Sequence, residues 1–151
     1  MAYVGGEARR TECVFCEALA GADDKAAYVL HRGDGAFLIL NAYPYAPGHL
    51  MAVLNRHVGD VTEASPAELQ AAMALVQRGV AALRAEYRAE GFNVGLNLGR
   101  VAGAGIADHL HIHVVPRWNG DSNFMPVLGD VRVLPESLAA TYERLKRRVD
   151  G

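Results

Sequence analysis

A chain of 151 residues is long enough for one domain with a buried core of ordinary size. Hydrophobic residues make up 51% of it and the formal net charge is −2, which excludes a disordered chain and a basic surface that recruits nucleic acid. The apolar stretches are short and interrupted by charges, so no membrane span is expected, and the N-terminus lacks the apolar run of a secretory signal. The two cysteines form no disulfide framework, and we expect one cytoplasmic domain over residues 1–151.

The first half of the chain predicts a loosely ordered tail over residues 1–10 and then three strands. Apolar and β-branched residues favour strands at 28–31, 36–40 and 49–54. The first two are joined by Arg32-Gly33-Asp34-Gly35, in which Asp-Gly favours a tight turn. A loop rich in Pro, Asn and Gly over residues 41–48 leads into the third strand.

A long helix is predicted from about Ser65 to Glu90. Ser65 suits the N-cap, Pro66 the first helical position, and Glu68 completes a capping box. We expect Gly91 to stop the helix. Its spacing predicts one core-facing stripe, which could also reach a partner subunit, made of Leu69, Met73, Val76, Val80, Leu83 and Tyr87.

The second half predicts two further strands and a second helix. The strands are expected at 92–98 and 109–115, separated by a glycine-rich loop over 99–108. Residues 121–129 are expected to be irregular, with a short extended piece at 131–134. Pro135 then opens a C-terminal helix whose apolar stripe is Leu138, Tyr142, Leu145 and Val149. A run of strands with one long helix inserted predicts an α+β fold with an antiparallel sheet.

Three histidines alternate along the last predicted strand. His109, His111 and His113 should emerge on one face, because successive side chains of a strand point to opposite sides. Leu110, Ile112 and Val114 would line the other face. Packing alone does not explain a row of three imidazoles, because each polar ring needs hydrogen-bond partners. Such a row can bind a metal, or it can hold one imidazole as a nucleophile.

The nucleophile interpretation fits the spacing better than one ion held by all three rings. Residues two apart on a strand lie roughly 6.5–7 Å apart, too far for adjacent side chains to converge easily on a single cation. We therefore expect the central His111 to attack, while a flanking imidazole polarises the substrate or protonates the leaving group.

Two blocks of sequence carry a family resemblance. Leu-Asn-Leu-Gly-Arg at 96–100, Ala-Gly-Ala-Gly at 102–105 and Asp-His-Leu-His-Ile-His-Val-Val-Pro-Arg-Trp at 108–118 resemble the histidine triad (HIT) family of nucleotidyl hydrolases and transferases. The upstream block, 37–41 and 47–57, matches the same family's nucleoside-binding half. The resemblance implies a HIT-like fold with a five-stranded antiparallel sheet, one long helix and a C-terminal helix. It also implies that His111 forms a covalent nucleotidyl intermediate during cleavage of a dinucleoside polyphosphate at the α-phosphorus.

Further site residues follow from the chemistry and from the resemblance. Attack on an anionic phosphorus favours a neutral nucleophile, and imidazole with a pKa of about 6.5 is largely neutral at pH 7. The resemblance implies that His49 supports the triad by hydrogen bonding and that Asn41 contacts the ribose. Candidate donors to the transition state and candidate contacts to the nucleotide are His113, Asn97, the loop amides near Gly103 and Gly105, and Trp118, which could instead fill a subunit contact.

Gly105 is a departure from part of the family. Several members carry a glutamine four residues before the first triad histidine, where it positions the acceptor, and this chain has Gly105 there. The small-residue loop resembles that of the bacterial diadenosine tetraphosphate phosphorylase branch, in which inorganic phosphate, not water, accepts the nucleotidyl group. For this chain the acceptor of the nucleotidyl group can therefore be phosphate or water.

Cys13 and Cys16 are spaced as half of a tetrahedral zinc site. The resemblance implies a structural zinc ion held by Cys13, Cys16, His57 and His109, and two reduced thiols without metal remain the alternative. A redox role is weakly supported because no thioredoxin-like strand precedes the pair. No organic cofactor is expected.

The resemblance also implies a homodimer in which two sheets join, with the long helix nearby, and a nucleotide substrate without nucleic acid or membrane partners. Two alternatives remain: a nucleoside phosphoramidate or adenylated-amine hydrolase on the same scaffold, and a non-enzymatic nucleotide-binding regulatory module. Incubation with diadenosine tetraphosphate separates an enzyme from a module, because a module leaves it uncleaved.

Overall fold

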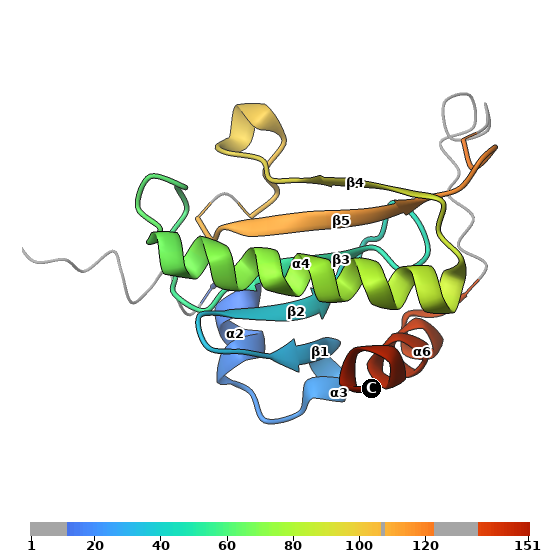
Figure 1. Cartoon of the computed structure of the whole chain (residues 1–151). Coiled ribbons are helices and arrows are strands. Elements are labelled where there is room, and N and C mark those ends of the chain that lie inside the picture. The colour runs from blue at the N-terminus through green and yellow to red at the C-terminus, as the bar shows by residue number, and fades with distance from the viewer. Residues whose placement is uncertain (1–11, 107, 123–135) are drawn as a thin grey trace, which may run out of the picture.

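A computed structural model describes residues 12–106, 108–122 and 136–151 (Figure 1). The helices are α2 (Val14–Ala20), α3 (Asp24–Ala27), α4 (Pro66–Tyr87), α6 (Leu138–Asp150) and the short 3₁₀ helix η1 (Arg100–Ala102). The strands are β1 (Val29–Arg32), β2 (Ala36–Leu40), β3 (Leu50–Leu54), β4 (Gly91–Gly95) and β5 (His111–Arg117).

The five strands form one antiparallel sheet in the order β1-β2-β3-β5-β4. This arrangement confirms the predicted α+β fold. It also places β5, the histidine strand, between β3 and β4, so that β3 supplies the neighbours of the histidines on one side.

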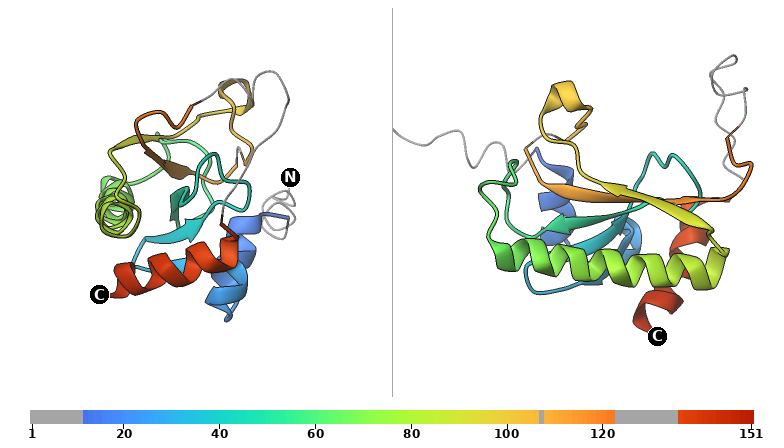
Figure 2. Two further views of the ribbon diagram at one scale, coloured as in Figure 1. Left: turned by 90° about the vertical axis from the view of Figure 1, so that its right-hand side faces the viewer. Right: turned by 45° about the horizontal axis from the view of Figure 1, so that its top comes forward.

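The sheet has a distinct core on each face. Leu38, Ala52 and Ile112 belong to the core that α4 and α6 cover, and Phe37 and Val53 belong to the core that α2 covers. Figure 2 shows α4 and α2 on opposite sides of the sheet. Alternation along each strand therefore directs the histidines of β5 away from α4, as the sequence pattern predicts.

Strand β2 has the predicted bounds, and the others are shifted by a few residues. The largest consequence is at β5, which begins at His111, so His109 and Leu110 precede the strand. The predicted strand over 92–98 ends early, at Gly95, and Leu96 to Leu98 lead out of the sheet.

The long helix is confirmed, with two corrections. Ser65 and Glu68 form the predicted capping box. The prediction that Gly91 stops the helix is wrong, because Arg88 caps it in the left-handed conformation (φ 53°) and Gly91 begins β4. Met73 does not belong to the buried stripe, since it is 47% exposed. Half of the buried face consists of small residues that allow close approach to the sheet. The buried residues are Ala72, Leu75, Val76, Gly79, Ala82 and Leu83.

The sequence analysis missed α2 and α3. No side chain caps the N-terminus of α2, so the usual local signal is missing there. Its C-terminal end is held by Arg32, whose guanidinium donates hydrogen bonds to the carbonyls of Ala18, Leu19 and Gly21. A tertiary contact from β1, rather than local propensity, therefore stabilises this short helix.

The C-terminal helix begins at Leu138, with Ser137 as its N-cap, and buries Tyr142, Leu145 and Val149 as predicted. The predicted tail over 1–10, most of the irregular stretch over 121–129, the extended piece over 131–134 and the position of Pro135 lie outside the described residues. Within the described ranges, every helix is too short or too polar to span a bilayer.

Candidate functional site

The candidate site lies on the sheet face opposite α4, where β3 and β5 run side by side. His111 pairs with Val53 and His113 with Met51, so both imidazoles and the side chain of His49, two residues before Met51, point to this face. The fold therefore gathers the predicted catalytic histidines from two separate segments of sequence.

His111 is held as a neutral ring with one nitrogen free for chemistry. Its Nδ1–H donates to the carbonyl oxygen of His109 at 2.8 Å, which leaves the lone pair on Nε2. Burial lowers the pKa of His111, because desolvation disfavours the charged ring. A neutral imidazole with a fixed tautomer is the form required of a nucleophile.

His113 belongs to a chain of hydrogen bonds that begins at the backbone. The N–H of Tyr45 donates to His49 Nδ1 at 3.1 Å, so His49 carries its proton on Nε2 and donates to His113 Nδ1 at 2.9 Å. His113 consequently presents an Nε2–H donor. Burial, with a smaller contribution from His111, lowers the pKa of His113 to about 4. The sequence analysis missed the role of Tyr45, which lies in a loop without a catalytic signature.

Asn41 lies at the end of β2, beside the hydrogen bonds that join Tyr45, His49 and His113. Its Oδ1 accepts a hydrogen bond from the N–H of Tyr43 at 2.8 Å, and its Nδ2 lies 3.4 Å from His49 Nε2. The side chain thus stabilises the loop over 41–48, and its predicted contact with a ribose stays a prediction.

Asn97 and the glycine-rich loop adjoin the His111 end of β5. Gly95, the last residue of β4, pairs with His113, and Asn97 lies two residues beyond it in the segment that leads out of the sheet. A Cβ at Gly103 would lie 3.8 Å from Asn97 Nδ2, whereas nothing lies within 4 Å of a Cβ at Gly105. The fold therefore brings Asn97 and Gly103 together and leaves open space at Gly105.

Trp118 lies at the other end of β5. It follows His111 by seven positions along the chain, a span of about 23 Å in an extended strand. Its indole N–H donates to the carbonyl of Tyr87 at 3.0 Å, at the C-terminal end of α4. Within one chain the structure does not bring Trp118 to the histidines.

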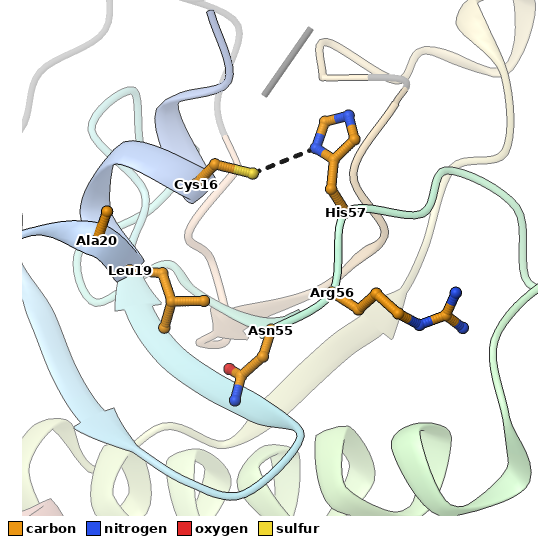
Figure 3. Close-up of a pocket in the computed structure, with 6 residues that line it drawn as sticks. All are labelled: Cys16, Leu19, Ala20, Asn55, Arg56 and His57. Carbon is orange, nitrogen blue, oxygen red and sulfur yellow. Dashed lines mark hydrogen bonds between the residues drawn. The ribbon is translucent and has the colours of Figure 1, made fainter. Parts of the chain in front are cut away.

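A second group of side chains, which we call the metal cluster, lies next to the triad. The donor atoms of Cys13, Cys16, His57 and His109 all lie within 4.8 Å of one another. The two His Nδ1 atoms are 3.2 Å apart, and Cys13 Sγ is 3.3 Å from His109 Nδ1. Cys16 and His57 line a pocket of about 300 Å³, and Figure 3 shows Cys16 Sγ facing His57 Nδ1.

The residues of the metal cluster fit zinc. Two thiols and two imidazoles are a donor set typical of structural zinc sites. His109 Nε2 lies 2.6 Å from the carbonyl oxygen of Leu54, an acceptor that places the ring proton on Nε2 and turns the Nδ1 lone pair toward the cluster. Both ring nitrogens of His109 are therefore engaged, Nε2 with Leu54 and Nδ1 with the cluster.

Phe15 connects the two groups, and the sequence analysis missed this as well. It lies on α2 between the two cysteines, and its ring contacts both His109 and His111. Its position in the Cys-x-x-Cys segment is the only sequence signal that points to it.

A comparison with protein-family models matches the HIT domain over residues 23–120. The chain belongs to the histidine triad family. A Mycobacterium tuberculosis protein named AP-4-A phosphorylase is 44% identical over 122 residues, which are 81% of this chain and 63% of that relative. The chain thus spans less than two thirds of that protein's length.

Two further relatives agree on the family. An uncharacterized HIT-like protein of the same organism is 35% identical over 109 residues, covering 72% of this chain and 74% of that protein. The crystal structure of a zinc-bound histidine triad family protein from Mycobacterium smegmatis has a TM-score of 0.75 at 26% identity, covering 93% of this chain and 95% of that one. This similarity agrees with the fold described above.

Proposed function

We propose that this HIT protein is a nucleotidyl transferase or hydrolase that cleaves dinucleoside polyphosphates at an α-phosphorus through a covalent nucleotidyl-His111 intermediate. The observation that carries the proposal is the hydrogen bond from His111 Nδ1 to the carbonyl of His109, which leaves Nε2 as the nucleophilic atom. The similarity to a protein named AP-4-A phosphorylase supports the substrate class.

In the first step Nε2 of His111 attacks the α-phosphorus, and the bond from phosphorus to the bridging oxygen breaks. The ring gains positive charge as the N–P bond forms, and the Nδ1–H···O=C bond to His109 stabilises that charge. The remaining polyphosphate leaves with the electron pair. In the second step phosphate or water attacks the same phosphorus, and the N–P bond breaks with its electron pair returning to Nε2, which restores neutral His111. When water attacks, its proton is released to solvent.

His113 and the loop residues stabilise the developing charge. His113 presents an Nε2–H because His49 donates to its other nitrogen, so it can donate to a phosphoryl or leaving-group oxygen. Asn97 and the amides near Gly103 and Gly105 are the further proposed donors, and Asn41 the proposed ribose contact. His109 acts through His111 and is a positioning residue rather than a group that touches substrate.

Zinc bound by Cys13, Cys16, His57 and His109 would be a structural link between α2 and the segment that precedes β5. None of the reaction steps proposed above uses the zinc ion. The proposed compartment is the cytoplasm, because two cysteines that converge on histidines as thiols suit a reducing environment.

The proposed assembly is a homodimer joined through β4. This strand forms one edge of the sheet, and Val94 in it is 45% exposed. Pairing of two β4 edges would continue the sheet across the interface and satisfy their backbone groups. Light scattering of the wild type and of Val94→Lys tests this: the account expects a dimer that the charge weakens, and a wild-type monomer contradicts it.

Product analysis with diadenosine tetraphosphate tests the reaction and identifies the acceptor. ADP plus ATP that appear only with inorganic phosphate establish a phosphorylase, in agreement with the open space at Gly105. AMP plus ATP without phosphate establish a hydrolase. Absence of cleavage under both conditions overturns the proposal and makes nucleoside phosphoramidates the next substrates to assay.

A further inference from the structure

Phe15 occupies a position that no catalytic or metal-binding role explains. It lies in the first turn of α2 between Cys13 and Cys16 and is 2% exposed. Its ring centroid is 5.4 Å from that of His109 at an interplanar angle of 73°, and 4.9 Å from that of His111 at 55°. One buried side chain of the metal-binding segment thus contacts both a ligand of the metal cluster and the nucleophile.

The hydrogen bond of His111 does not by itself fix the direction of Nε2. A single bond from Nδ1 lets the ring pivot about the donor–acceptor line, and χ2 of histidine has a broad energy minimum. Two aromatic rings restrict that motion. The ring of His113 contacts the ring of His111 at a centroid distance of 4.8 Å. The ring of Phe15 also contacts the ring of His111, and it contacts that of His109 as well.

The position of Phe15 depends on the metal cluster. Cys13 and Cys16 flank it in sequence, and both thiols face His109 Nδ1, at 3.3 and 3.5 Å. Helix α2 has no side-chain cap at this end, and the contacts of the two thiols with His109 are restraints on its first turn. A shift of that turn would move the Phe15 ring relative to His111.

We propose that Phe15 is a positioning residue that transmits the geometry of the metal cluster to the nucleophile, by holding the His111 ring so that Nε2 faces the α-phosphorus. The inference rests on the proposed function of His111. It adds that the Cys-x-x-Cys segment contributes to turnover through a hydrophobic contact as well as through its thiols.

The test compares Phe15→Leu with Phe37→Leu. Phe37 is the same residue type, is fully buried and belongs to the same core. It lies on β2, two strands from β5, and no aromatic contact joins it to a histidine ring among the described residues. Both variants should lose similar thermal stability, so stability alone cannot separate them.

We expect Phe15→Leu to lower kcat by about 10- to 100-fold with little change in KM, because a misplaced reacting group costs rate rather than binding. Phe37→Leu should keep kcat within about twofold of the wild type. Equal kcat losses in the two variants, or no loss in either, overturn the proposal. If Phe15→Leu does not fold, Phe15→Met makes the smaller change and is compared with Phe37→Met.

A spectroscopic measurement separates this proposal from the reaction assignment. Long-range ¹H–¹⁵N spectra report which nitrogen of His111 carries the proton and how uniform its environment is. We expect one Nδ1–H form in the wild type and in Phe37→Leu, and broadened or mixed signals in Phe15→Leu and after zinc chelation. Unchanged signals in Phe15→Leu overturn the positioning role. An inactive wild type with these spectral changes would instead overturn only the proposed reaction.

Discussion

Two pairs of imidazoles, His57 with His109 and His49 with His113, lie at similar separations but have different hydrogen-bond partners. In the metal cluster, Nδ1 of His57 and Nδ1 of His109 lie 3.2 Å apart beside two thiols. In the other pair, His49 Nε2 lies 2.9 Å from His113 Nδ1 in a series of hydrogen bonds that starts at the N–H of Tyr45. The distances are similar and the roles are opposite.

In each pair, one ring nitrogen contacts a backbone group outside the pair, and that group determines which nitrogen of the ring carries the proton. The carbonyl of Leu54 accepts from His109 Nε2 and turns a lone pair toward the cluster, which suits a metal ligand. The N–H of Tyr45 donates to His49 Nδ1 and makes the opposite nitrogen a donor, which suits stabilisation of negative charge. Under the proposed function, imidazole serves as ligand, donor or nucleophile according to backbone groups that the sequence does not display.

The largest expected effect comes from removing the nucleophile. His111→Ala should lower kcat by at least about 10³-fold and leave nucleotide affinity within about tenfold, since Nε2 forms the covalent bond while other groups bind the nucleotide. Steady-state kinetics and nucleotide titration check this. His31→Ala, on β1 and outside the site, is the matched control and should retain wild-type turnover. Normal turnover in His111→Ala would remove His111 from the mechanism.

Breaking the metal cluster should affect metal content first and stability with it. Cys13→Ser replaces a sulfur ligand by a weaker oxygen ligand, so the bound zinc of the purified protein should fall sharply and Tm should fall by several degrees. Metal analysis and thermal unfolding check both quantities. Val14→Ser, one residue away and 52% exposed, should change neither. Equal zinc content in Cys13→Ser and the wild type would contradict the ligand set.

Breaking the hydrogen-bond chain should have an intermediate effect. His49→Phe removes the donor to His113 Nδ1, so His113 no longer has one fixed tautomer, and kcat should fall by about 10- to 100-fold. His49→Gln retains an N–H donor and should recover part of the loss. Wild-type kcat in His49→Phe would show that the chain does not contribute to turnover.

The smallest effect concerns pH. The pKa of His113 is lowered to about 4 in the folded protein, whereas the unfolded ring titrates near 6.5. Between these values the unfolded chain binds more protons, so the free energy of unfolding should fall as pH drops from about 6.5 towards 4. Urea unfolding at several pH values checks the slope, and His113→Asn should reduce it. An identical slope in His113→Asn would assign the pH dependence to other groups.

The sequence predicted most of the sheet and the helix cap because both depend on local patterns. A short apolar run next to an Asp-Gly turn identified β2 with its bounds, and Ser65 with Glu68 identified the start of α4. The same patterns could not predict α2, which is held by Arg32 from β1 and by a cluster whose members are far apart in sequence.

For the site, sequence identified residue types and the structure supplies their separation. The pattern placed His109 in line with His111 and His113, but His109 precedes β5, and both its ring nitrogens are engaged away from the nucleophile. The contacts of Phe15 and Tyr45 arise from a helix and a loop packed against the histidines, and no spacing rule encodes such contacts. Trp118 belongs to the histidine triad motif in the sequence, yet within a single chain it lies at the end of β5 that is far from His111.

The most direct test of the central claim is to trap the intermediate. The wild type, mixed briefly with diadenosine tetraphosphate, is quenched under conditions that preserve phosphoramidates and is then analysed by peptide mass spectrometry. The account predicts a nucleotidyl group on His111, absent from His111→Ala and lost when the acceptor is supplied before quenching. A nucleotidyl group on another residue, or cleavage with no covalent adduct at any time, would contradict it.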